Sequence, residues 1–167
     1  SNAAYAGGIQ YQTHIQKNGW EQKWKKDGEM SGTSGEAKRL EAIKIRLTGQ
    51  LAEVYDVVYR VHRQTYGWTD WVKNGTECGT TGQAKRLEAI RIALTGEMAE
   101  HYDVYYRVHA QTYGWLAWAK NGEAAGTAGL SKRLEGIQIV LVPKGGAAPA
   151  NNYGGVVTTN KQTYIKK

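Results

Sequence analysis

The sequence predicts an all-β domain with pseudo-threefold symmetry, and three observations carry this prediction. One segment of about 50 residues occurs three times, and its leading histidines, His14, His62 and His109, are 48 and 47 residues apart. Within each copy, apolar residues recur at every second position, as in a strand with one buried face. A repeat this short, with no disulfide or metal pattern, is marginal alone, so the three copies are expected to share one core.

The second copy shows the first elements that each repeat is expected to form. Alternation of apolar and polar residues over 57–62 predicts a first strand, and residues 68–73 predict a second. Asn74-Gly75 then predicts a tight hairpin turn, because both residue types adopt positive φ at low cost. A short third strand is expected over residues 76–80.

The last segment of each copy could form either a helix or a strand. In the second copy, residues 86–94 read RLEAIRIAL and contain good helix formers. The third copy reads RLEGIQIVLV, with Gly136 inside it and β-branched residues around it. Isoleucine at every second position in all copies favours a strand, with Glu88, Ile90 and Ile92 on one face. Four strands in each of three copies predict twelve strands.

Two architectures suit a pseudo-threefold all-β domain of this size, the β-trefoil and the β-prism. Long outer strands that form a barrel, capped by short middle hairpins, favour the β-trefoil over the β-prism. Separate or stacked repeats are a third alternative.

The domain boundaries follow from where the repeats begin and end. Ser1-Asn2-Ala3 resembles the remnant of a cleaved tag, and Gly, Ala and Pro dominate the residues after the third copy. Gln162-Thr163-Tyr164 echoes a tripeptide of the second and third copies, so the tail is expected to be a docked strand or the start of a degenerate repeat. The expected boundaries are 1–8 for the lead-in, 9–142 for the three-repeat domain (repeats about 9–54, 55–101 and 102–142), 143–155 for a linker and 156–167 for the tail.

Two tryptophans recur in each copy and are the first candidates for ligand binding. In the second and third copies they are three residues apart, which places their rings on opposite faces of a strand, one buried and one exposed. An exposed ring can stack on the C–H face of a sugar while polar neighbours bond its hydroxyl groups. The first copy has one extra residue between its tryptophans, which requires a bulge. The six residues are Trp20, Trp24, Trp68, Trp71, Trp115 and Trp118.

A histidine, and a glutamine two residues later, form the expected polar part of the same sites. Both lie on the outer face of the first strand, close to the Gly-Trp that follows. The alternative is a histidine that is satisfied by a backbone carbonyl group. The six residues are His14, Gln16, His62, Gln64, His109 and Gln111.

An arginine and a glutamate in the fourth strand are expected to be structural. Both share a face with the core isoleucines, and a carboxylate directed toward a core must be paired or hydrogen-bonded. Each glutamate is therefore expected to fix a loop through its arginine or through backbone N–H groups. A glycosidase needs two carboxylates, and no second acid recurs nearby. The pairs are Arg39 and Glu41, Arg86 and Glu88, and Arg133 and Glu135.

The recurring positions resemble the clostridial hydrophobic repeat with tryptophan, or ChW repeat. The pattern is Y-x-x-H-x-Q, then G-W-x-x-W-x-x-(N/D)-G-x-x-x-G-T-x-G-x-x-x-R-L-E-x-I-x-I-x-L, from about Ile9 to Val142. The first copy departs from it, with Asn18 where the others have Tyr66 and Tyr113, so its site is expected to be the most altered. The resemblance implies a secreted or cell-surface protein of a Gram-positive anaerobe, of the Clostridia, that attaches to polysaccharide or protein.

Composition and motifs exclude several function classes. The sequence has no common hydrolase, nucleotide-binding or metal signature, so no catalytic residue, metal ligand or cofactor is predicted. Cys78 is the only cysteine and aligns with Ser31 and Ala125, which predicts a small buried position. The net charge of +7 is spread over the repeats and the tail without a nucleic-acid motif. No apolar run reaches the roughly 18 residues that span a membrane.

Two functions remain for a non-catalytic, extracellular monomer. The chain has 11 Tyr and 6 Trp but no Phe, and aromatic rings with a polar group suit interfaces. Tryptophan that recurs together with glutamine favours a carbohydrate-binding module with up to three weak sites that act by avidity. The alternative is a module that docks a surface protein through one contiguous apolar patch.

Overall fold

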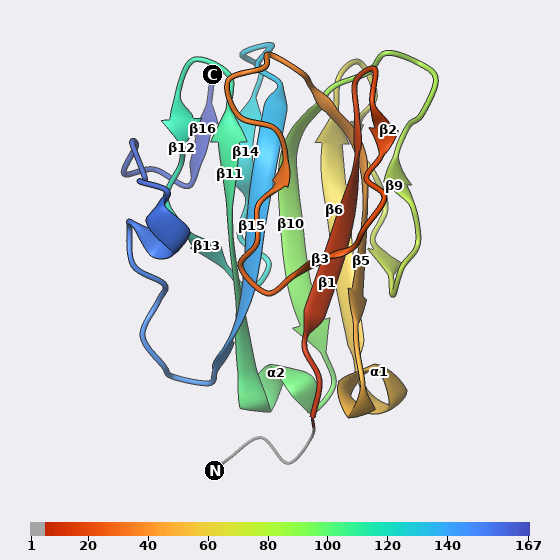
Figure 1. Cartoon of the computed structure of the whole chain (residues 1–167), viewed down its shortest axis with the longest axis vertical. Coiled ribbons are helices and arrows are strands. Elements are labelled where there is room, and N and C mark those ends of the chain that lie inside the picture. The colour runs from red at the N-terminus through yellow and green to blue at the C-terminus, as the bar shows by residue number, and fades with distance from the viewer. Residues whose placement is uncertain (1–5) are drawn as a thin grey trace.

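The strands of this protein form three sheets around one shared core. The computed structural model describes residues 6–167, so the expected tag remnant lies outside the described residues. Strands dominate the chain, as predicted, and the described strands form no closed barrel (Figure 1). The choice between a β-trefoil and a β-prism stays a prediction.

Each repeat contributes two long antiparallel strands and three short ones. The first repeat contains β1 (Ile9–Ile15), β2 (Gly19–Trp20), β3 (Lys25–Lys26), β4 (Ser31–Gly32) and β5 (Leu40–Leu47). The second contains β6 (Asp56–Arg63), β7 (Gly67–Trp68), β8 (Val72–Lys73), β9 (Cys78–Gly79) and β10 (Leu87–Thr95). The third contains β11 (Tyr102–Ala110), β12 (Gly114–Trp115), β13 (Ala119–Lys120), β14 (Ala125–Ala128) and β15 (Leu134–Pro143). Two short helices, α1 (Gln50–Val54) and α2 (Met98–His101), join the repeats.

Neighbouring repeats exchange one short strand, and the exchange closes a ring. The strand β9 of the second repeat pairs with β5 of the first, and β14 of the third pairs with β10 of the second. The strand β4 of the first repeat pairs with β15 of the third. One apolar cluster contains buried residues of all three repeats, so the predicted sharing of a core is confirmed.

The prediction of four strands in each repeat is wrong by one strand. The expected second strand is interrupted in the structure, because β7 and β8 both pair with β6 but in registers that differ by one residue. The third repeat has the same slip, and the first repeat has a slip of two residues, which accommodates its extra residue. The fourth predicted segment is a strand in every repeat, as expected.

Glycine is required where an exchanged strand crosses the neighbouring sheet. Gly79 has a φ of +115°, and a Cβ atom there would lie 2.4 Å from the carbonyl oxygen of Glu41 and 2.9 Å from the Cα atom of Ala42. Both contacts are with backbone atoms, which cannot move without shifting β5. Gly32 and Gly126 meet the same obstacle at the other two crossings.

We therefore expect Gly79→Ala to lower the free energy of unfolding by about 3 kcal/mol. The matched control is Gly82→Ala, because Gly82 also has a positive φ of +72° but no atom within 4 Å of the added Cβ. That control should cost only about 1 kcal/mol. Urea denaturation of the two variants measures the difference, and equal losses would contradict the close approach.

The C-terminal segment packs against the third repeat. Its elements are a short helix, η1 (Tyr153–Gly155), and β16 (Tyr164–Lys166), which pairs in parallel with β14. Between them, the N–H group of Thr159 donates to the carbonyl oxygen of Trp115 over 2.8 Å. Figure 1 shows this blue segment beside β12 and β13. The end of the predicted linker, 150–155, is therefore part of the packed structure.

None of the helices within residues 6–167 is long and apolar enough to cross a membrane. Cys78 is a buried free thiol, as expected, and burial raises its pKa above the usual value.

Candidate functional site

The first tryptophan of each pair lies against the histidine of the same repeat. The short strand that carries it pairs beside the histidine, as in the register between His62 and Trp68. The two rings meet edge to face, with 5.4 Å between their centroids in all three repeats. Sequence reasoning placed each histidine close to the Gly-Trp that follows it, and the structure brings the two rings into contact.

A buried glutamate links each histidine to an arginine. In the second repeat, His62 Nδ1 lies 3.0 Å from Glu88 Oε1, and Arg86 Nε donates to Glu88 Oε2 over 2.8 Å. The corresponding distances are 2.9 and 2.8 Å in the first repeat and 2.8 and 2.8 Å in the third. The predicted arginine–glutamate pairs are thus present, and each carboxylate has a partner on both oxygens.

The predicted position of the glutamate on the isoleucine face is wrong. The pairing of β10 with β6 shifts between Leu87 and Ala89, so Glu88 is the extra residue of a bulge. A bulge turns the side chain away from the strict alternation of a strand. The shift recurs in the other two long pairs, and it directs each glutamate to the outward-facing histidine.

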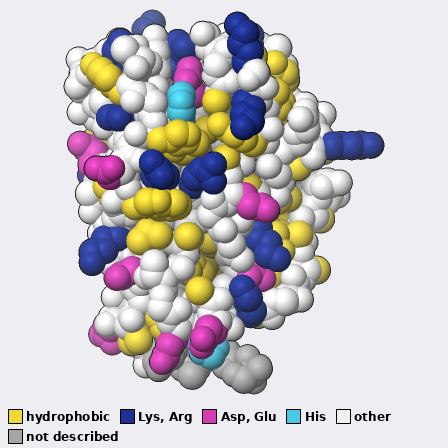
Figure 2. Space-filling view, turned by 180° about the vertical axis from the view of Figure 1, so that it is seen from behind, with side chains coloured by type: hydrophobic (Ala, Val, Ile, Leu, Met, Phe, Trp, Pro, Cys, Tyr) yellow, Lys and Arg dark blue, Asp and Glu magenta, His cyan; other side chains and the backbone are white. Residues whose placement is uncertain are grey.

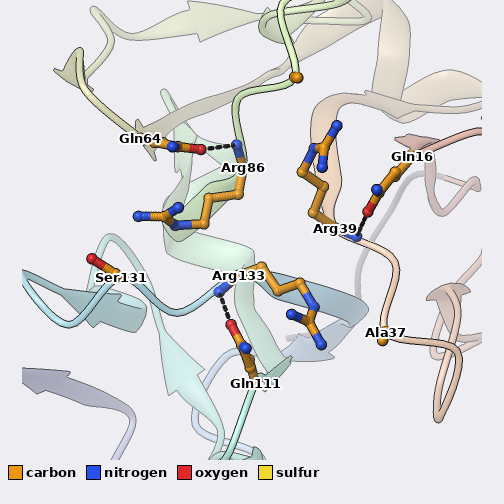
Figure 3. A pocket seen from close by; sticks show the side chains of 9 residues that line it. Gln16, Ala37, Arg39, Gln64, Arg86, Gln111, Ser131 and Arg133 are labelled. Carbon is orange, nitrogen blue, oxygen red and sulfur yellow. Dashed lines mark hydrogen bonds between the residues drawn. The ribbon is translucent and has the colours of Figure 1, made fainter.

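Each glutamine binds the backbone of the arginine in its own repeat, and none of the described hydrogen bonds joins it to a tryptophan. Gln64 Oε1 accepts a hydrogen bond from the backbone N–H of Arg86 over 3.2 Å, and the Gln64 N–H donates to the Arg86 carbonyl oxygen over 2.9 Å. The other two glutamines make the same pair of bonds. All three line a hollow between the repeats together with the arginines (Figure 3).

Cationic side chains lie over the tryptophan rings, and the sequence analysis did not single them out. The guanidinium carbon of Arg60 lies 5.6 and 5.5 Å from the ring centroids of Trp68 and Trp71. In the first repeat, Lys44 Nζ lies 4.3 Å from Trp20, and the guanidinium carbon of Arg46 lies 3.9 Å from Trp24. Figure 2 shows one face of the molecule on which Lys and Arg side chains lie among hydrophobic ones. In the third repeat Arg107, the equivalent of Arg60, lies over both tryptophan rings, whereas the first repeat uses Lys44 and Arg46 instead.

The three tryptophan pairs differ in exposure. Trp71 is 43% exposed, whereas Trp115 is buried and Trp118 is half-buried beneath the C-terminal segment. Trp118 Nε1 donates to the carbonyl oxygen of Ala150 over 3.2 Å, and its ring meets Tyr153 edge to face at 5.7 Å. The first repeat was expected to be the most altered, but the third is the one that is covered.

The first repeat adds a hollow beside its second tryptophan. It has a volume of about 360 Å³ and is lined by Trp24, Arg46 and Ala52 of the first repeat and by the Asn74-Gly75 turn of the second. Among residues 6–167, no group of three or more His, Cys, Asp or Glu side chains is placed to hold a metal ion.

Comparison with known proteins agrees with the repeat pattern. A family model described as Clostridial hydrophobic W matches residues 14–49, 62–96 and 109–143. No curated protein and no solved structure is significantly similar to the chain.

Proposed function

Because the chain belongs to the Clostridial hydrophobic W family, we propose that it is a non-catalytic extracellular module that binds polysaccharide of plant or bacterial cell walls. The observation that carries the proposal is the open outer face of the second repeat. There, the exposed Trp71 ring lies beside the Arg60 guanidinium. A ring face next to hydrogen-bond donors suits a sugar, whose C–H groups stack on the ring while its hydroxyl groups accept the bonds.

The cations beside the tryptophans favour an acidic polysaccharide. Arg60 uses Nε to bind the carbonyl oxygen of Thr69, which leaves its two outer nitrogens to face a ligand. A guanidinium group binds a carboxylate through two parallel hydrogen bonds, and the chain has a net charge of +7. The first repeat offers the Trp24 hollow with Arg46 on its wall. We place the sites in the first two repeats, where two weak contacts on one chain reinforce each other.

Trp71→Ala is expected to weaken binding of the recognised polysaccharide about tenfold or more, because truncating an anchoring Trp at a binding site removes at least about 1–2 kcal/mol. The matched control is Trp118→Ala, which removes the equivalent ring where the C-terminal segment covers it. Tryptophan fluorescence, titrated with acidic and neutral cell-wall polysaccharides, measures both affinities. Equal weakening in the two folded variants would contradict a site at Trp71.

A second candidate function is the docking of a protein, and one observation favours it. The C-terminal segment is a stretch of polypeptide seated on the tryptophan pair of the third repeat. A partner protein could place a similar segment on the open face of the second repeat. A synthetic peptide of residues 147–163 is the probe for this alternative. Saturable binding of the peptide, lost in Trp71→Ala, with no response to any polysaccharide would replace the first proposal with the second.

A further inference from the structure

We propose that the hollow between the three repeats is a binding site for one compact multivalent oxyanion, such as a polyphosphate or a polycarboxylate. The hollow has a volume of about 450 Å³. Each repeat supplies one arginine, one glutamine and one small residue to it, and Figure 3 shows the arginines around a common centre. The lining residues are Gln16, Ala37, Arg39, Gln64, Ala84, Arg86, Gln111, Ser131 and Arg133. None is a tryptophan, so this site is separate from the proposed polysaccharide faces.

Hydrogen-bond donors dominate the lining. Each arginine binds its glutamate through Nε over 2.8 Å, and no acceptor within residues 6–167 engages the outer guanidinium nitrogens of these three residues. Each glutamine accepts from a backbone N–H through Oε1, which fixes Nε2, the donor atom, as its free end. The outer nitrogens of three guanidinium groups and the amide nitrogens of three glutamines therefore belong to residues that line the hollow, and none of them has a hydrogen-bond acceptor among residues 6–167.

Acidic side chains are held away from the hollow. Glu41, Glu88 and Glu135 are buried, and both oxygens of each carboxylate are occupied by the histidine and by arginine Nε. No Asp or Glu belongs to the lining. The glutamates thus fix the orientation of the guanidinium groups and leave the outer nitrogens to a ligand. Three cations from three directions favour an anion with two or three charged groups over a singly charged one.

The backbone conformation of the small lining residues allows a substitution that tests the role of charge in the hollow. Ala37, Ala84 and Ser131 have left-handed φ values of 56°, 53° and 56°, and Asn and Asp are the side chains that best tolerate this conformation after glycine. Ala84 is exposed. Ala84→Asp and Ala84→Asn therefore add nearly the same atoms at the hollow and differ in one negative charge, without touching an arginine–glutamate pair.

The experiment is calorimetric titration of the full chain with tripolyphosphate, citrate and acetate at low salt. We expect one tripolyphosphate or citrate per chain, no measurable acetate binding, and affinity that falls about tenfold in Ala84→Asp but not in Ala84→Asn. Trp71→Ala should bind the anion with the affinity of the unmodified chain, because Trp71 does not line the hollow. The anion proposal can therefore hold even if the polysaccharide proposal fails. Several anions per chain, or equal affinities of the Asp and Asn variants, would overturn it.

The anionic groups could belong to a free molecule or to a polymer. Titration with polygalacturonate, with and without saturating tripolyphosphate, separates the two sources. If tripolyphosphate displaces polygalacturonate from the Trp71→Ala variant, the hollow binds carboxylate groups of the polymer. If the polymer does not compete, the hollow takes a free anion.

Discussion

Arg107→Ala is expected to lower the free energy of unfolding by about 3–5 kcal/mol and to release the C-terminal segment from the third repeat. The Arg107 side chain is fully buried, and its burial lowers the pKa of the guanidinium group. All of its donors have partners, and four of the five acceptors belong to the C-terminal segment. They are Gln138 Oε1 at 2.7 Å, Asn151 O at 3.0 Å, Thr158 Oγ1 at 2.7 Å, Tyr153 O at 3.1 Å and Val156 O at 2.8 Å.

The large expected loss of stability follows from the oxygen atoms that lose their hydrogen-bond donor. Alanine removes all five donors at once. Gln138 Oε1, Thr158 Oγ1 and Val156 O then lose their bond to Arg107, whereas Asn151 O and Tyr153 O each keep a bond from a backbone N–H group. A buried polar group that loses its partner costs about 1–3 kcal/mol unless water reaches it. The lost bonds weaken the attachment of the segment, and lifting of the segment would let water take the place of Arg107. We therefore expect new protease cleavage between residues 144 and 163, together with a change in the fluorescence of Trp118, which the segment covers.

Arg60→Ala is the matched control for this prediction. Arg60 occupies the equivalent position in the second repeat, two residues before His62, but it is half-buried and its described hydrogen bond is to Thr69. Its loss should cost about 1 kcal/mol or less. Urea denaturation compares the two variants. A similar loss of stability in both, or an intact protease pattern in Arg107→Ala, would show that Arg107 does not hold the segment.

The repeats made the strands predictable, because three copies of one pattern reinforce each other. Isoleucine at every second position was enough to choose strand over helix for residues 86–94, and the structure confirms a strand there. The exchange of β4, β9 and β14 between repeats was not predictable in the same way. Because the copies have similar sequences, a short strand fits the long strand of its own repeat and that of the neighbouring repeat equally well, and the sequence pattern does not distinguish the two pairings.

The sequence indicated which residues recur at the candidate site, but not which of them contact each other. Strict alternation placed Glu88 with Ile90, and a single bulge reversed that placement and gave Glu88 to His62. Arg60 and Arg107 stand at equivalent positions, yet only the structure shows that one faces an open surface and the other lies beneath the C-terminal segment. Such differences depend on contacts between residues about 50 positions apart, which periodicity does not encode.

Stability is expected to fall steeply as the pH rises from about 10 to 12. Three buried tyrosines connect the repeats in a ring: Tyr11 accepts from the Ile139 N–H over 3.2 Å and donates to Glu29 O. Tyr59 and Tyr106 make the corresponding bonds to the backbone. Burial raises the pKa of Tyr59 to about 12 and also raises the pKa values of Tyr11 and Tyr106.

The direction of the effect follows from linkage between protonation and folding. A tyrosine in the unfolded chain has a pKa of about 10, so the folded state favours the neutral phenol. The stabilisation is fully present below pH 10 and is lost as the pH rises through the folded-state pKa. For Tyr59, two pKa units correspond to roughly 3 kcal/mol, and the other two residues add to it. A domain of this size has about 5–15 kcal/mol in total, so the three losses together are large enough to unfold it.

Circular dichroism and tyrosinate absorbance, followed together against pH, test this prediction. The buried phenols should ionise only as the β signal disappears. Tyr59→Phe should lower stability at neutral pH by about 1–3 kcal/mol, since it leaves the Thr76 carbonyl oxygen without its donor, but it should also flatten the dependence above pH 10. Tyr66→Phe, at a residue that is 50% exposed, is the control that should leave the curve unchanged. If all tyrosines ionised while the β signal stayed intact, the prediction would be contradicted. The fold would then tolerate buried phenolate groups, and tyrosine ionisation would not drive unfolding.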